Sequence, residues 1–367
     1  MKALKTLLLT LLLLPLLTAS AHAQDIYREA AEATGVYAME DLDSETRAVS
    51  GALEPDGSYD VGEALDRLWA KLRESLALEL QSSMSFAAGL VAIALLCALA
   101  GSLCSSESIR DYINLSACCA AAVSLLGGMD GIVSQTVDSL NKLSDYSKAA
   151  LPALFTAAAA CGAVSSSAAK YAAVCIAMDV LMSTAQRVVI PLVYAFIAIA
   201  LANSLFPNAI LANMSRLTKW LAGIIMTGLT IAFSGYIGMT GLVTGSVDAV
   251  AVKTAKTVIS TALPVVGGII SDASSVVLSA AQVIKSSAGV FGLIAVCALC
   301  AGPFAMLSVK MLILRAAAAV SDTIPNGKLS GLISDVSTAM GLLLGLLGCC
   351  GIMLFISLMS GMKVVTS

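Results

Sequence analysis

The chain has 367 residues, of which 58% are hydrophobic and only 12% are charged, with a net charge of -3. Soluble domains are about 45–50% apolar and about 25% charged. The apolar excess is too large for one globular core, so the composition excludes an ordinary soluble domain and predicts a membrane protein. Residues 24–84 hold fourteen acidic and five basic residues. An acidic segment therefore precedes a sparsely charged body.

Residues 1–23 have the pattern of a secretory signal peptide. Two lysines precede a leucine-rich run, and small residues flank His22 before a cleavage site between Ala23 and Gln24. We expect the mature N-terminus to lie outside the cytoplasm; an uncleaved anchor helix is the alternative. His22 is the only histidine. The mature chain would therefore lack Ser-His-Asp and Cys-His nucleophile systems and His-ligated metal sites.

Residues 24–84 form the expected exported region. Its first part is acidic and rich in turn-forming residues. Asp60 and Glu63 then have the spacing of a helix N-cap with a capping box. Apolar residues follow at intervals of three and four, which predicts an amphipathic helix over 60–84. This helix is expected either to pack on the membrane body or to bind a partner.

Apolar runs that could cross a membrane begin at Ser85. Residues 85–104 contain no charge, and about 20 such residues cross a hydrocarbon core of about 30 Å. A second run at 113–133 completes the two expected spans of segment 85–131. Further runs cover 150–168, 188–206, 220–244, 287–308 and 337–360, and three shorter or charged stretches are ambiguous. The prediction is an all-α polytopic membrane protein with about seven to nine spans.

Two pairs of prolines share one sequence offset. The motif Ala-Leu-Pro occurs at Pro152 and again at Pro264, 112 residues later. The same offset relates Pro191 to Pro303. Proline in a membrane helix frees a backbone carbonyl that a neighbouring group or water must satisfy. Transporters and channels use such broken helices to build sites at membrane depth.

The proline pairs predict an internal duplication with proline-broken helices. Repeat A covers residues 132–243, and repeat B with the C-terminus covers residues 244–367. The stretch after the second Ala-Leu-Pro adds two glycines and an aspartate to the candidates. The expected gate or cavity residues are Pro152, Pro191, Pro264, Gly267, Gly268, Asp272 and Pro303.

Charged residues inside apolar runs are functional candidates because an ionised group in lipid is costly. Besides Asp272, these candidates are Asp179, Lys285, Lys310 and Arg315. A competing interpretation places them at the membrane interface, where long basic side chains reach water. None of these charges recurs at the 112-residue offset. This absence disfavours a symmetric ion site shared by the repeats.

Other motifs point to packing rather than chemistry. The ten cysteines lie in or beside apolar runs, and the Cys297-x-x-Cys300 motif lacks a second pair, so we expect the cysteines to act as small apolar residues. Gly341 and Gly345 form a G-x-x-x-G motif that is typical of close helix contacts. Walker-type glycine loops and basic patches are missing from the sequence. No cofactor, metal, catalytic residue or nucleic acid is therefore expected.

Two stretches of the sequence resemble a known family. They are "KTVISTALPVVGGIISDASSVVLSAAQVIKSSAGVFGLIAV" and "GPFAMLSVKMLILRAAAAVSDTI", and both are similar to the C-terminal membrane region of the stage III sporulation protein AE family. The resemblance covers about residues 85–360 and is most specific over 253–325. The order of signal peptide, short exported region and multi-spanning body also agrees with this family.

The resemblance implies a multi-pass protein of the mother-cell membrane around the forespore. It implies a non-enzymatic subunit of a channel-like, secretion-like complex required for late forespore development. The implied partners are a secretion-type ATPase, ring-forming proteins and a forespore membrane protein, besides the lipid bilayer; self-association is a further expectation. The residues alone leave two alternatives, a stand-alone secondary transporter using Asp272 or Asp179, and an intramembrane enzyme.

Overall fold

The computed structural model describes residues 31–32, 39, 44–51, 59–103, 106–160, 164–233, 235, 267–323 and 327–363. The expected signal peptide, with its cleavage site at Ala23 and Gln24, lies outside these residues, and so does Pro264. Nearly all described residues are helical. The prediction of an all-α membrane protein fold is confirmed in its helical content.

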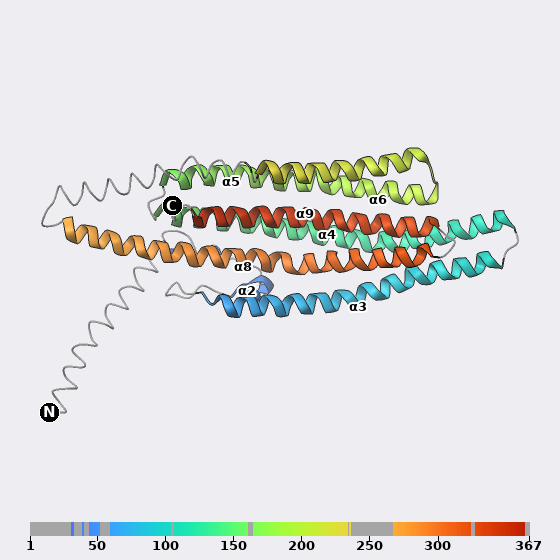
Figure 1. The fold of residues 1–367 in the computed structure, drawn as a ribbon, viewed down its shortest axis with the longest axis horizontal. Helices are drawn as coiled ribbons and strands as arrows, with labels where there is room; N and C mark the ends of the chain where they lie inside the picture. Colours follow the sequence, from blue (N-terminus) through green and yellow to red (C-terminus); the bar gives the residue numbers. More distant parts are fainter. Residues whose placement is uncertain are drawn as a thin grey trace, which may run out of the picture.

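Long helices lie side by side along one axis of the molecule (Figure 1). The described elements, which include the short α2 and η2, are α2 (Ser44–Ser50), α3 (Val61–Ser102), α4 (Glu107–Ala160), α5 (Val164–Thr184), the π-helical turn η2 (Ala185–Val189), α6 (Ile190–Leu205), α8 (Gly267–Asp322) and α9 (Gly327–Lys363). Residues 209–233 form one more helix after a short turn. Helices α3 and α8 run in the same direction, and α4 and α9 return beside them.

Several helices are much longer than a membrane is thick. Helices α3, α4 and α8 have 42, 54 and 56 residues, which is roughly 60–85 Å at 1.5 Å per residue. Five described segments are long and apolar enough to cross a membrane: Val61–Ser102, Ser108–Ala160, Tyr171–Leu205, Ser286–Asp322 and Leu329–Met362. The expected seven to nine spans are not confirmed in the described part of the chain.

Two boundaries drawn from the sequence fall inside continuous helices. The amphipathic helix predicted over 60–84 and the span predicted over 85–104 are both parts of α3. Residues 63–88 contain neither glycine nor proline, so nothing in the local sequence ends the helix where its polarity changes. The boundary between segment 85–131 and repeat A likewise lies within α4.

The expected helix breaks at Pro152 and Pro303 are wrong, because both prolines lie inside continuous helices. A proline removes one backbone hydrogen bond and bends a helix, but packing on neighbouring helices can hold the helix together. Pro191 is accommodated differently, at the start of α6 just after η2. There the Ile190 amide donates to the Ala185 carbonyl, the wider hydrogen bond of a π-bulge.

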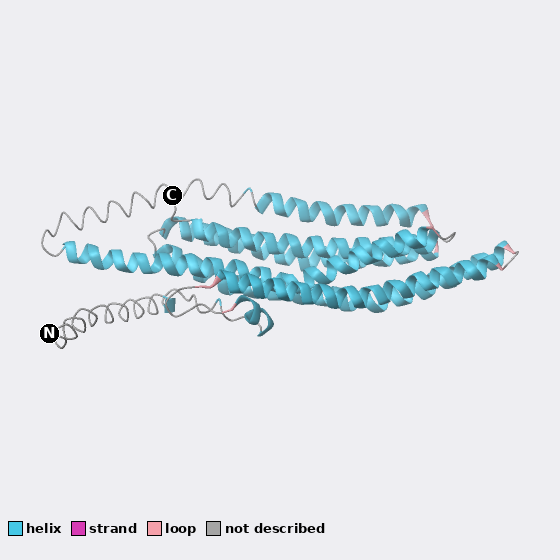
Figure 2. Cartoon of the chain, turned by 60° about the horizontal axis from the view of Figure 1, so that its bottom comes forward, coloured by secondary structure: helices cyan, strands magenta, loops and turns pink. Residues whose placement is uncertain are grey.

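Helices α8 and α9 form the centre of the bundle, and glycines on α9 let its neighbours approach. A side chain at Gly341 would meet Met311 of α8 at 3.2 Å, and one at Gly345 would meet Met226 at 3.7 Å. The prediction that this G-x-x-x-G motif marks a close helix contact is confirmed. The α3–α4 hairpin extends beyond the ends of the other helices in both views (Figures 1 and 2).

The internal duplication stays a prediction. Each proposed repeat contains an antiparallel helical pair: α5 to α6 with residues 209–233 in repeat A, and α8 with α9 in repeat B. The prolines paired by sequence nevertheless stand in different local structures, since Pro191 follows a π-helical turn and Pro303 lies within an α-helix.

Candidate functional site at the junction of α3 and α8

Lys310 forms an ion pair in the middle of the bundle. Its Nζ lies 2.9 Å from Oε2 of Glu79 on α3, and the two side chains are only 22% and 26% exposed. Partial burial strengthens the attraction between the charges but also removes hydration from both, so the close contact compensates for lost water. The sequence analysis placed Glu79 in the exported helix and Lys310 among the candidate intramembrane charges, and therefore missed their contact.

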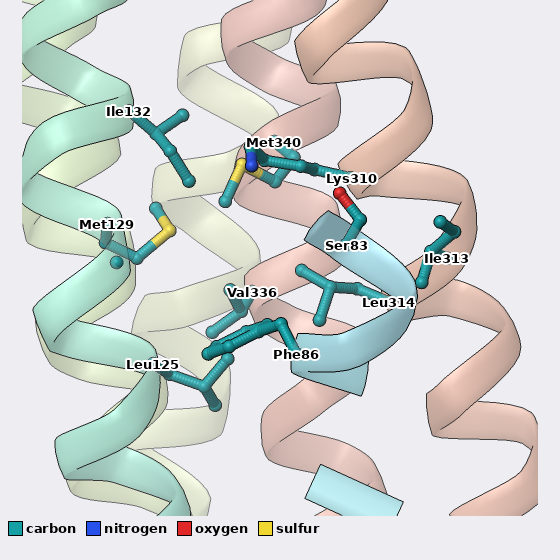
Figure 3. A pocket seen from close by; sticks show the side chains of 11 residues that line it. Ser83, Phe86, Leu125, Met129, Ile132, Lys310, Ile313, Leu314, Val336 and Met340 are labelled. Atoms are coloured by element: carbon teal, nitrogen blue, oxygen red, sulfur yellow. The ribbon is translucent and has the colours of Figure 1, made fainter. Parts of the chain in front are cut away.

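A small apolar pocket lies beside this ion pair, between α3, α4, α8 and α9 (Figure 3). Its volume is about 70 Å³, and its lining comprises Ser83, Phe86, Leu125, Gly128, Met129, Ile132, Lys310, Ile313, Leu314, Val336 and Met340. Sites for drug-sized ligands have about 300–1,000 Å³. The pocket is therefore suited to water or to a small chemical group.

Ser83 contributes a buried hydroxyl group to the lining of this pocket. Its side chain is 5% exposed, and its hydroxyl has no hydrogen-bond partner among the described residues. A buried polar group without a partner costs about 1–3 kcal/mol. A water molecule bound between the Ser83 hydroxyl and the neighbouring ion pair would relieve that cost.

A larger, polar cavity of about 260 Å³ lies beside Pro303. Its lining comprises Thr46, Val49, Lys71, Gln135, Asp138, Ser139, Lys142, Ala298, Leu299, Gly302 and Pro303. Because proline has no N–H, the carbonyl of Leu299 lacks its usual helical donor. Polar side chains from α3 and α4 thus lie near a backbone carbonyl of α8 that lacks its helical hydrogen bond. Of the expected cavity residues, the structure brings Pro303 to this cavity.

Of the other predicted site residues whose side chains the structure describes, none lines these two cavities. Asp179, Arg315 and Pro191 are exposed, and Pro152 is half-buried within α4. Gly267, Gly268, Asp272 and Lys285 lie in the first turns of α8, and their side chains are outside the described part. In the described residues, no group of three His, Cys, Asp or Glu side chains could hold a metal ion.

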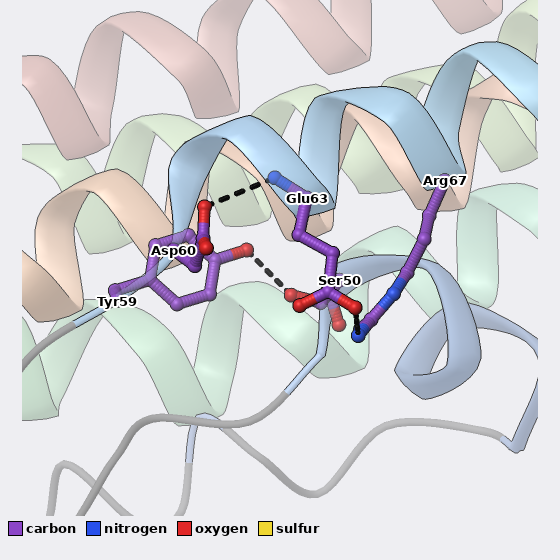
Figure 4. A network of polar contacts seen from close by, with 5 residues as sticks. All are labelled: Ser50, Tyr59, Asp60, Glu63 and Arg67. Carbon is purple, nitrogen blue, oxygen red and sulfur yellow. Dashed lines mark hydrogen bonds and ion pairs between the residues drawn. The ribbon is translucent and has the colours of Figure 1, made fainter.

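A polar network attaches the start of α3 to α2 (Figure 4). The Asp60 carboxylate accepts a hydrogen bond of 3.0 Å from the Glu63 amide, which confirms the predicted N-cap. The Glu63 side chain pairs with Arg67 instead of completing the capping box. The Tyr59 hydroxyl donates to the carbonyl of Ser50 at the end of α2.

Tyr59 also connects this network to α8. Its ring packs edge-to-face on Phe291, with the ring centroids 5.5 Å apart and the planes at 84°. Burial raises the pKa of Tyr59 from 10.0 to about 12, although the nearby Arg67 cation opposes this rise. The phenol therefore stays neutral and keeps its proton for the bond to Ser50 at physiological pH.

Comparison with known proteins assigns the family. A sequence model of the family described as stage III sporulation protein AE matches residues 57–363. The chain belongs to this family. A curated relative, the stage III sporulation protein AE of Bacillus subtilis (strain 168), is 22% identical over 227 residues, or 62% of this chain and 57% of the relative. No solved structure matches the chain.

The family match begins just before α3 and ends at the last residue of α9. The ion pair and the apolar pocket lie within it, and so does most of the polar cavity's lining. The resemblance inferred from the sequence is confirmed. In this member of the stage III sporulation protein AE family, the matched region is a bundle of long helices that includes candidate membrane spans.

Proposed function

We propose that the chain is a non-enzymatic membrane subunit of a channel-like complex between mother cell and forespore, required for late forespore development. Its proposed location is the mother-cell membrane around the forespore, with the mature N-terminus outside the cytoplasm. Its proposed partners are a secretion-type ATPase, ring-forming proteins and a forespore membrane protein. Membership of the stage III sporulation protein AE family supports the role in sporulation.

The observation that carries the proposal is the continuity of α3. One helix joins a charged half, with exposed Arg73 and Glu74, to an uncharged half from residue 80 onward. The Glu79–Lys310 ion pair then fixes this helix to the central helix α8. A partner bound to the charged half could therefore transmit its movement to the membrane part through one rigid element, as a subunit of an assembly requires.

Co-purification tests this proposal. The tagged full-length chain is purified in mild detergent from sporulating cells, and its partners are identified by mass spectrometry. We expect a secretion-type ATPase and ring-forming proteins to be recovered. Trp69 is 55% exposed on the charged half of α3, and Trp69→Ala should reduce the recovery of these partners. Tyr112→Ala is the control, because Tyr112 is 73% exposed but lies far from the charged half, near the tip of the α3–α4 hairpin. Repeated recovery of the chain alone would overturn the proposal.

A stand-alone secondary transporter is the second candidate, and the polar cavity beside Pro303 favours it. The cavity brings the carboxylate of Asp138 to a proline inside a long apolar helix. Purified protein in vesicles with an entrapped pH-sensitive dye would then move protons without partners, and Asp138→Asn would abolish this flux. Asp145→Asn is the control, because Asp145 is 74% exposed and pairs with Lys148. No flux by the wild-type chain would eliminate a proton-coupled transporter.

A further inference from the structure

Helices α3 and α8 are parallel and held in one register. Tyr59 packs on Phe291, and Glu79 pairs with Lys310. Tyr59, just before α3, and Glu79 are 20 positions apart, and Phe291 and Lys310 of α8 are 19 apart, so the two contacts fix the relative position of the two helices. Beyond the ion pair, α3 continues for 23 residues to Ser102, whereas α8 continues for 12 residues to Asp322.

This register separates the uncharged stretches of α3, α4, α8 and α9 into two bands. The hairpin band comprises residues 80–102 of α3 and 112–129 of α4, and neither stretch contains Asp, Glu, Lys or Arg. The core band comprises residues 286–309 of α8 and 336–362 of α9, which are equally free of charge. Each stretch is about 27–40 Å long at 1.5 Å per residue.

The two bands meet end to end at the apolar pocket. The hairpin band begins right after Glu79, and the core band ends right before Lys310. Met129, the last α4 residue of the hairpin band, and Val336, the first α9 residue of the core band, line the same pocket (Figure 3). Because a hydrocarbon core is about 30 Å thick, one bilayer can enclose only one of the two bands.

On one side the core band faces a charged surface, whereas the uncharged helix α6 packs on α9 at another side. Beside it run the polar parts of α3 and α4, whose exposed charges are Glu63, Asp66, Arg67, Arg73, Glu74, Asp138, Lys142, Asp145 and Lys148. Each charge at the centre of a bilayer costs about 2.5–3.5 kcal/mol on insertion scales. The apolar windows of α8 and α9 are 44% and 50% buried, against 22% for α3 and 39% for α4. Packing against protein explains the apolar sequence of the core band.

The hairpin band has the surface of a lipid-facing segment. Leu96 and Leu99 near its far end are 67% and 62% exposed, and Leu103, just beyond the band, is 86% exposed. Polar and aromatic residues mark both ends of the band, as at membrane interfaces: Tyr112 follows Arg110 and Asp111 at the tip, and Tyr194 donates to Asp130 at the other end. Tyr112 and Asp130 are 18 residues apart, which is about 27 Å along a helix.

We propose that lipid acyl chains enclose the hairpin band, and that the core band is the protein interior of a helical body outside the hydrocarbon. The Glu79–Lys310 pair then lies at the membrane interface, where partial hydration is available. The shorter α8–α9 hairpin enters the hydrocarbon only with its tip, where Ser330 donates to Asp322 at 3.0 Å. Of these four helices, only α3 and α4 cross the bilayer completely.

Tryptophan fluorescence tests this placement, because the chain has only two tryptophans, Trp69 and Trp220. Full-length protein is reconstituted in phosphatidylcholine vesicles, with acyl chains either brominated or unmodified, and probed also with aqueous iodide. One variant, Trp220→Phe, keeps Trp69 beside the core band. A second variant replaces both tryptophans with Phe and carries Leu96→Trp. A third variant has the same background and carries Leu103→Trp, so that the result does not depend on the folding of one variant.

Brominated lipid is expected to quench the Leu96→Trp and Leu103→Trp variants several-fold, whereas iodide quenches Trp69. Trp69 quenched by brominated lipid as strongly as the hairpin sites would place the core band in the membrane and overturn the proposal. Hairpin sites protected from both quenchers, in variants that keep wild-type helical content, would show that protein covers the hairpin band, and this outcome would also overturn it.

Discussion

Glu79 and Lys310 are 231 residues apart in the sequence, yet their charged atoms lie 2.9 Å apart in the structure. Glu79 is the last charged residue of α3, and Lys310 is the first charged residue of α8 after the uncharged stretch 286–309. The pair therefore does two things: it holds α3 in register with α8, and it stands at the boundary between the hairpin band and the core band.

Removing one charge of this pair should destabilise the protein. In Lys310→Met the Glu79 carboxylate, which is 26% exposed, keeps its desolvation without its partner, so we expect a loss of about 1–3 kcal/mol. The midpoint of thermal unfolding in detergent measures this loss. Lys148→Met removes a pair that is 71% and 74% exposed and should cost less than about 1 kcal/mol. Equal shifts for both variants would contradict the structural role of Lys310.

Asp60→Ala should weaken the first turn of α3. The substitution removes the hydrogen bond from the Glu63 amide to the Asp60 carboxylate, and loss of such an N-cap costs about 1 kcal/mol. Amide hydrogen exchange at Glu63 should become faster, while exchange near residue 90 stays unchanged. Asp60→Ser keeps an N-capping oxygen and should restore slow exchange; fast exchange in this variant would exclude capping as the cause.

Attachment of α2 should weaken at high pH through Tyr59. Its folded-state pKa of about 12 exceeds the ordinary value of 10.0, because burial disfavours the phenolate. The stabilising contribution is therefore complete below pH 10 and is lost as the pH rises through 12. The difference in tyrosinate absorbance between wild type and Tyr59→Phe follows this group alone. A difference that titrates near 10 would contradict burial of the phenol in solution.

Gly361→Ala should destabilise the contact between α9 and α4. A Cβ at this position would lie 2.7 Å from Cδ2 and 3.1 Å from Cγ of Leu154, so the branched side chain would have to move. Such overpacking typically costs 1–3 kcal/mol. Gly331→Ala in the same helix is the matched control, since nothing lies within 4 Å of its added Cβ, and should stabilise by up to about 1 kcal/mol through helix propensity. A stabilising Gly361→Ala would show that α9 does not pack so closely on α4.

Local signals in the sequence predicted the helices well. The Asp60 N-cap is confirmed because capping depends on residues three positions apart. The glycines of the G-x-x-x-G motif lie at helix contacts, Gly341 against α8 and Gly345 against the helix of residues 209–233, because small residues let a neighbouring helix approach. The breaks expected at Pro152 and Pro303 were wrong, because packing on other helices outweighs the loss of one backbone hydrogen bond.

The sequence by itself determined that this is a helical, apolar protein of the stage III sporulation protein AE family, since composition, periodicity and motifs are local properties of the chain. Only the tertiary structure decided which apolar stretches lie at the same position along the axis of the helical bundle. Lipid and a protein core both favour apolar side chains. Hydropathy therefore cannot show that residues 80–102 face lipid whereas residues 286–309 face protein. The contact of Glu79 with Lys310 separates them, because it fixes the register of two helices that are far apart in the chain.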